Sequence, residues 1–173
     1  MPEVPEEMKT KGRPALPFDD LKEMLYRRVP PAIWEDDYIE LDAIELPDMS
    51  VNRGSLGPPQ WARLADTNSL EWGVIGFQVG DLPPDFNYHG IYQYSTRAEH
   101  SPLRSNYPHS EVRAYEVPTD PVGPKKHINA KLLAEVDQVS PDVYQRWREY
   151  LRRRCQVILK QGEIPFEQTP QKY

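Results

Sequence analysis

The abundance of proline constrains this chain more than any other feature of its sequence. Nineteen of its 173 residues are proline, against an average usage of about 5%. Each proline fixes its own φ angle and lacks an N–H donor, so it interrupts helices and interior strands. We therefore expect many fixed turns and several short elements. The length suits one domain with a real hydrophobic core.

Charge is distributed unevenly along the chain. Residues 1–50 contain 13 acidic and 6 basic side chains, whereas residues 51–173 contain 14 and 15. The acidic first third disfavours nucleic-acid binding by the whole surface, because phosphates require positive potential. A local basic site could still bind nucleic acid or a nucleotide. The alternative explanation of the acidic residues is that they only keep the protein soluble.

Targeting signals are not evident in the sequence. No apolar run approaches the roughly 18 residues of a membrane span, and residues 1–14 show no apolar core of a secretory signal. The single cysteine, Cys155, cannot form an internal disulfide. We expect a cytoplasmic protein without membrane association.

The N-terminal half is predicted to contain a helix and two strands. Residues 1–17 are expected to form an extended acidic, proline-rich arm, which leaves 18–173 as a single domain. Phe18–Val29 suits a short helix, with acids near its start and arginines near its end. Tyr38–Leu46 alternates as a strand, and Glu71–Val79 is the best strand. Pro58-Pro59 is expected to begin a short helix.

The C-terminal half is predicted to contain a hairpin and a helix. Ile91–Ala98 and Glu111–Val117 alternate as strands around a long loop, Glu99–Ser110. Ser140-Pro141-Asp142 is typical of a helix start, and an apolar stripe predicts that the helix continues to about Lys160. We expect an α+β fold in which this C-terminal amphipathic helix packs on one face of a small, largely antiparallel sheet.

Three of the four histidines lie within the 28 residues from Tyr88 to Tyr115. Histidine transfers protons near neutral pH. If Glu111–Val117 is a strand entered from His109, then His109, Glu111 and Arg113 share one face of it. Glu111 would then orient the imidazole, and His100 would approach across the loop. The alternative is that histidines and tyrosines simply fill a half-exposed sheet face.

These residues predict an acid–base site acting on a phosphoester, either RNA or a nucleotide. His109 and His100 would carry the protons, as in a metal-independent ribonuclease or phosphodiesterase, with Glu111 as the orienting carboxylate. The phosphate would be bound by four further side chains: Arg53, Arg113, Asn52 and Tyr107. Asn52 and Arg53 belong to the phrase SVNRGS, which is otherwise an ordinary polar turn.

Cofactor and metal chemistry are not favoured. His100, His109 and Glu111 are acceptable zinc or iron ligands, but their spacing matches no standard signature and the nearby arginines oppose a cation. The phosphate-loop, dinucleotide-binding and nucleophile-elbow motifs are absent. We expect neither a cofactor nor a metal.

Two other function classes remain open. A non-enzymatic subunit or adaptor would bind a protein partner through residues 1–17 or through the arginine-rich helix, residues 141–160. A weaker alternative is NAD-dependent ADP-ribosyl transfer with Arg53, Tyr92 and Glu111.

Overall fold

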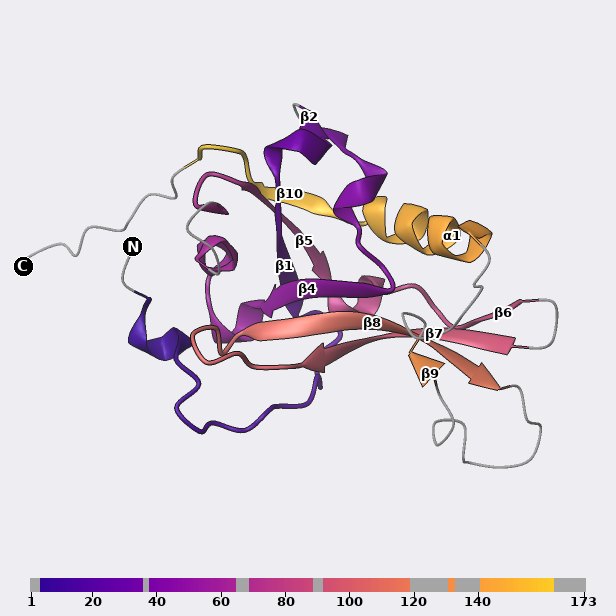
Figure 1. Cartoon of the computed structure of the whole chain (residues 1–173), viewed down its shortest axis with the longest axis horizontal. Coiled ribbons are helices and arrows are strands. Elements are labelled where there is room, and N and C mark those ends of the chain that lie inside the picture. Colours follow the sequence, from indigo (N-terminus) through magenta and orange to yellow (C-terminus); the bar gives the residue numbers. More distant parts are fainter. Residues whose placement is uncertain are drawn as a thin grey trace, which may run out of the picture.

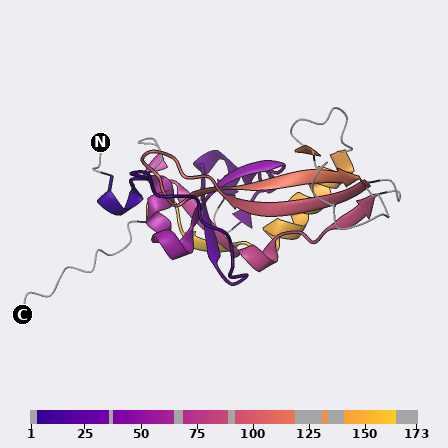
Figure 2. The ribbon, with the colours of Figure 1, turned by 90° about the horizontal axis from the view of Figure 1, so that it is seen from below.

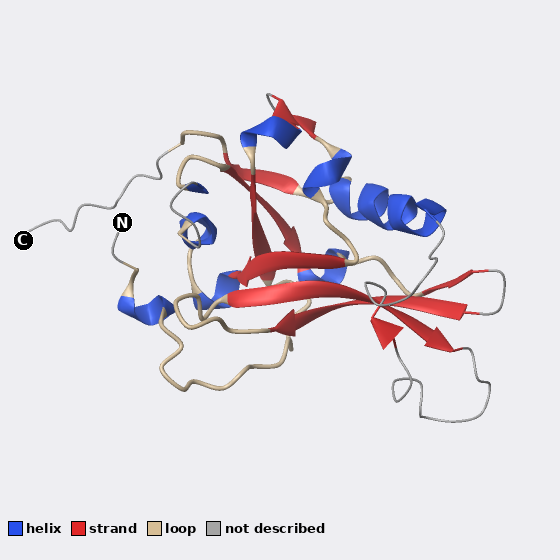
Figure 3. Cartoon of the chain, viewed as in Figure 1, coloured by secondary structure: helices blue, strands red, loops and turns tan. Residues whose placement is uncertain are grey.

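The structure, a computed structural model, describes residues 4–35, 38–64, 69–88, 92–118, 131–132 and 141–163. Strands and short 3-10 turns make up most of it, and the α-helix of the described part is α1 (Pro141–Arg152) (Figure 3). The strands are β1 (Met24–Val29), β2 (Trp34–Glu35), β3 (Tyr38–Ile39), β4 (Asp48–Arg53), β5 (Gly73–Gln78), β6 (Phe86–Tyr88), β7 (Tyr92–His100), β8 (His109–Pro118), β9 (Lys131–Leu132) and β10 (Gln156–Leu159). The 3-10 turns are η1 (Glu6–Met8), η2 (Pro31–Ile33), η3 (Leu41–Ala43), η4 (Gly54–Leu56), η5 (Pro59–Arg63) and η7 (Val79–Asp81).

One antiparallel sheet dominates the molecule. Its strand order is β10-β5-β1-β4-β8-β7-β6, with β9 paired to β8, while β2 and β3 form a separate pair. The class is therefore α+β. No helix among the described residues is long and apolar enough to cross a membrane.

The sheet opens between β1 and β4. β1 pairs with β5 over six residues but with β4 only at Leu25–Arg53 and Tyr26–Asn52. Figure 1 shows β1 running steeply away from β4, which continues beside β8. The backbones separate beyond Tyr26, and side chains occupy the space between them.

Alternation along the strands separates a core face from an outer face. Leu25, Met49 and Val112 point into the main hydrophobic cluster, which also contains Trp147 and Leu151 of α1. Trp147 meets Tyr94 edge-on, with the ring centroids 5.7 Å apart. The polar residues of the predicted site are therefore distributed by strand position between this core face and the opposite, outer face.

The predicted helix over Phe18–Val29 is wrong. Met24–Val29 is strand β1, and its side chains alternate between partly buried and buried. The spacing of Leu21, Met24 and Leu25 fits a helix locally, but pairing of β1 with the apolar strand β5 overrides that preference. One of the buried residues in this strand is the charged Arg27, so the sequence does not show the apolar alternation expected of a half-buried strand.

The predicted C-terminal helix ends early. α1 stops at Arg152, and Gln156–Leu159 forms β10, which pairs with β5 at the edge of the sheet. Gly162 adopts a left-handed φ of 70° in the turn after β10. A helical period and a short strand are indistinguishable over so few residues.

Three other predicted elements are present at somewhat different lengths. β5 occupies the core of the predicted strand Glu71–Val79 and is interior to the sheet, and β7 pairs with β8 as the predicted hairpin. Pro59 begins η5, as expected from Pro58-Pro59. The predicted strand Tyr38–Leu46 is only partly correct, because β3 ends at Ile39 and η3 follows.

Candidate functional site

The sheet divides the predicted site between its two faces. His109 pairs with Asn52, and Glu111 with Ser50, so these residues share the outer face. Arg53 pairs with Leu25 on the core face, and His100 pairs with Ser110, the neighbour of His109 that points to the opposite side. The two histidines therefore lie on opposite faces of the β7–β8 hairpin.

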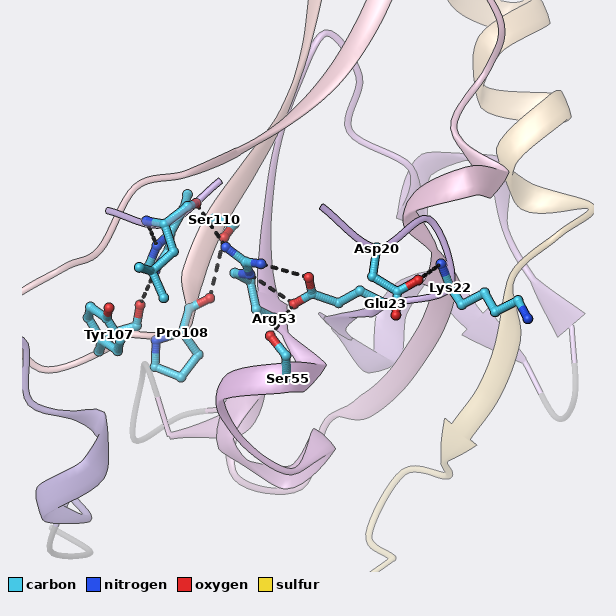
Figure 4. Close-up of polar contacts among 10 residues, drawn as sticks. Asp20, Lys22, Glu23, Arg53, Ser55, Tyr107, Pro108 and Ser110 are labelled. Atoms are coloured by element: carbon cyan, nitrogen blue, oxygen red, sulfur yellow. Dashed lines mark hydrogen bonds and ion pairs between the residues drawn. The ribbon is translucent and has the colours of Figure 1, made fainter. Parts of the chain in front are cut away.

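Arg53 forms a buried ion pair. Its Nε and Nη2 donate to the two carboxylate oxygens of Glu23 at 2.8 and 2.7 Å, and the Ser55 hydroxyl also donates to Glu23 (Figure 4). The two charged side chains are only 6% and 5% exposed. Burial by itself raises the pKa of Glu23, but the hydrogen bonds from Arg53 and Ser55 outweigh it, and the pKa lies below its ordinary value.

The remaining contacts of Arg53 bind the N-terminal segment. Its Nη1 donates to the Leu16 carbonyl at 2.9 Å, and the guanidinium lies 3.8 Å from the centre of the Phe18 ring. Because the Glu23 carboxylate binds two N–H groups of its guanidinium, Arg53 has a structural role at this position.

His100 is fixed by two backbone groups. The Leu16 N–H donates to its Nδ1 at 2.8 Å, and its Nε2 lies 2.6 Å from the Tyr107 carbonyl. This pattern requires the neutral ring with the proton on Nε2. Burial is the main cause that lowers the pKa of His100, and the Arg53 charge acts in the same direction. No ring nitrogen is left for a substrate.

The N-terminal arm, residues 4–17, packs against the loop that joins β7 to β8 (Figure 2). The Tyr107 N–H donates to the Met8 carbonyl at 2.6 Å, and the Tyr107 hydroxyl donates to the Pro14 carbonyl at 2.9 Å. Arg13 stacks 3.7 Å from the centre of the Tyr107 ring. Tyr107, predicted to contact phosphate, thus holds the arm.

Arg113 is surrounded by carboxylates on the outer face. It contacts Glu111, lies 3.1 Å from Glu99 and 3.6 Å from Asp48. These charges raise the pKa of Arg113 against the opposing effect of its burial. Glu111, the predicted orienting group, therefore pairs with arginine, and the Ser101 carbonyl lies 2.6 Å from His109 Nδ1 instead.

A pocket of about 370 Å³ occupies the opening between β1 and β4. Its wall combines apolar side chains with a larger number of polar ones. The lining residues are Tyr26, Arg27, Arg28, Pro30, Glu45, Ser50, Val51, Asn52, Ala62, Trp72, Leu103, Asn106 and His109. The volume lies within the range of small-molecule sites, about 300–1,000 Å³.

His109 and Asn52 are the predicted site residues that line this pocket. Because its Nδ1 donates to the Ser101 carbonyl, the neutral His109 ring carries an unprotonated Nε2. Within the described residues, that Nε2 makes no hydrogen bond. His109 is therefore oriented by the fold and keeps one nitrogen available to accept a proton.

Two neighbouring arginines of β1 have different roles at the pocket. Arg27 bridges the opening: it donates to the Ala43 carbonyl at 2.7 Å and the Ser50 carbonyl at 3.1 Å, and it pairs with Glu45 at 2.7 Å. Arg28 has no ion pair with any described residue, and its guanidinium lies 5.8 Å from the centre of the Trp72 ring. Arg28 therefore gives the pocket a positive charge that no described residue neutralises by an ion pair.

Sequence reasoning missed Tyr26, Arg28, Trp72 and Asn106. Tyr26 and Arg28 were placed on a helix, and their common face becomes visible only when residues 24–29 are recognised as a strand. Asn106 lies in the loop between β7 and β8, whose path no local pattern predicts.

Other predicted features can also be placed. Two members of the set suggested for ADP-ribosyl transfer, Arg53 and Glu111, lie on opposite faces of the sheet. The side chain of the third, Tyr92, lies outside the described part, as do the whole residues His89 and His127. No cluster of His, Cys, Asp or Glu suited to a metal occurs among the described residues. Burial raises the pKa of the Cys155 thiol to about 12.

Comparison with protein-family models, curated proteins and solved structures found no match for this chain. The functional argument therefore depends on the geometry of the chain itself.

Replacing Glu23 by glutamine should destabilise the protein strongly. The substitution leaves the Arg53 charge buried without its partner, which costs about 3–5 kcal/mol of unfolding free energy. The matched control is Glu6→Gln, because Glu6 and its partner Lys9 are 55% and 42% exposed and such a pair should contribute less than about 1 kcal/mol. Equal losses in urea denaturation of the two variants would contradict this assignment.

Stability should also depend on pH through His100. Because the pKa of His100 is lowered in the folded protein, the unfolded chain takes up its proton first as pH falls through about 6.5. Stability contributed by neutral His100 is therefore full above that pH and declines towards pH 5. Urea denaturation at pH 7.5 and 5.5 should show a smaller acid-induced loss in His100→Gln than in the wild type. Identical losses would show that His100 does not titrate in this way.

Proposed function

We propose that the chain binds a small phosphate ester in the pocket between β1 and β4. The observation that carries the proposal is a pocket of about 370 Å³ that is lined both by Arg28 and by His109. Among the described residues, Arg28 has no ion-pair partner and the Nε2 of His109 has no hydrogen-bond partner. A guanidinium binds a phosphate through parallel charge-assisted hydrogen bonds, and such bonds are about twice as strong as neutral ones.

His109 gives the same pocket a group for proton transfer. With its Nδ1–H directed to the Ser101 carbonyl, its Nε2 accepts a proton from a hydroxyl or water beside the ester. The phosphoester chemistry supported here uses this single imidazole together with the Arg28 charge, since His100 and Arg53 are engaged on the other face.

The wall of the pocket favours a compact ligand. Trp72, Val51 and Leu103 supply apolar surface, whereas Ser50 and Asn52 supply hydrogen-bonding groups. A mononucleotide has this combination of an apolar ring and a charged end, so we take a nucleotide as the ligand of choice.

The role of Arg28 is tested by calorimetric titration with the four common ribonucleoside 5′-monophosphates at low salt. Arg28→Ala should weaken the tightest of them about 10- to 100-fold, the equivalent of one hydrogen bond to a charged group. Arg153→Ala is the charge-matched control, because Arg153 is exposed in the turn after α1, outside the pocket, and should leave affinity unchanged. Equal weakening in both variants, or no binding by the wild type, would overturn the proposal.

A further inference from the structure

Two asparagines form a buried pair at the wall of the pocket. Asn106 Nδ2 donates to Asn52 Oδ1 at 2.8 Å, although the residues are 54 positions apart in the sequence. Asn52 is 5% exposed and Asn106 is 4% exposed. Asn52 comes from β4 and Asn106 from the β7–β8 loop, so the pair joins β4 to this loop at the pocket.

The pair leaves one donor and one acceptor without a partner. Asn52 Nδ2 and Asn106 Oδ1 are both buried and make no hydrogen bond with any described residue. A buried polar group left in this state costs about 1–3 kcal/mol, and native proteins rarely retain one. Exchanging the oxygen and nitrogen of both amides reverses the roles but still leaves one donor and one acceptor.

The surroundings of the pair suit an aromatic ring with a polar edge. Tyr26 is paired with Asn52 across β1 and β4, and Trp72 lines the same pocket. Aromatic side chains provide stacking surfaces for bases, with stacking worth about 1–3 kcal/mol per base. Phosphate alone cannot satisfy the pair, because a fully ionised phosphate has acceptors but no donor for Asn106 Oδ1.

We propose that Asn52 and Asn106 recognise the edge of a nucleobase, which makes the ligand a mononucleotide with its phosphate at Arg28. This inference rests on the proposed function and specifies its ligand class. On its Watson–Crick edge every common base presents a hydrogen-bond donor next to an acceptor, which complements the acceptor and donor that the two amides leave without a partner among the described residues. The terminal torsion of asparagine is broad, so either amide can turn toward the bound base, and hydrogen bonds to the base then replace the one between the two amides.

The test compares nucleoside 5′-monophosphates with ribose 5-phosphate, which has the same phosphate and sugar but no base. In calorimetric titration of the wild-type protein, at least one nucleotide should bind 10-fold or more tightly than ribose 5-phosphate. The double variant Asn52→Leu/Asn106→Leu should bind that nucleotide no more tightly than ribose 5-phosphate, while its affinity for ribose 5-phosphate stays unchanged.

The double variant is suited to this test because replacing both partners of a buried hydrogen bond by apolar groups of similar shape is nearly neutral for stability. Its melting temperature is measured alongside the wild type, and Asn87→Leu, at an exposed position of β6, is the matched control. If the double variant does not fold, the wild-type comparison still decides whether the base contributes to affinity.

The outcomes separate this inference from the proposed function. Equal affinity of the wild type for ribose 5-phosphate and for every nucleotide overturns base recognition but leaves phosphate binding in place. A nucleotide preference that persists in the folded double variant also overturns the assignment of the two asparagines. Absence of binding by both ligand classes contradicts the proposed function itself.

Discussion

The bridge made by Arg27 across the opening of the sheet is the interaction on which the proposed site depends. Beyond Tyr26, β1 and β4 no longer pair, and the Arg27 side chain donates to the Ser50 carbonyl of β4 across the gap and to the Ala43 carbonyl at the end of η3. Burial lowers the pKa of this guanidinium, and pairing with Glu45 opposes the shift. The bridge supplies a donor to two carbonyls beside the opening, and Arg27, Glu45 and Ser50 all line the pocket there.

The sheet also explains why one run of sequence contributes to two separate structures. On the core face, His100 and Arg53 join the N-terminal arm to the hairpin loop and to Glu23. On the outer face, His109 lines the pocket with residues of β1 and β4. The arm contacts the loop that supplies Asn106, so one wall of the pocket rests on a segment far away in sequence.

The strands β5, β7 and β8 were predictable because alternation and turn residues are local signals. β1 was not, since a buried arginine interrupts its apolar alternation and its strand state depends on pairing with β5. Strand alternation also predicts that His109, Glu111 and Arg113 share a face. The hydrogen-bond and ion-pair partners of these three residues depend on β4 and on the β7–β8 loop, and no local sequence pattern predicts those contacts.

The central claim is that a phosphate ester binds in the pocket between β1 and β4, and not at His100, which contacts the N-terminal arm. Long-range ¹H–¹⁵N spectra of the imidazole rings, recorded while a nucleoside 5′-monophosphate is added, test it most directly. The account predicts saturable shifts of the His109 ring nitrogens, with Nε2 changing most, while the His100 signals stay in place. Saturable shifts at His100 with an unchanged His109 ring would contradict it.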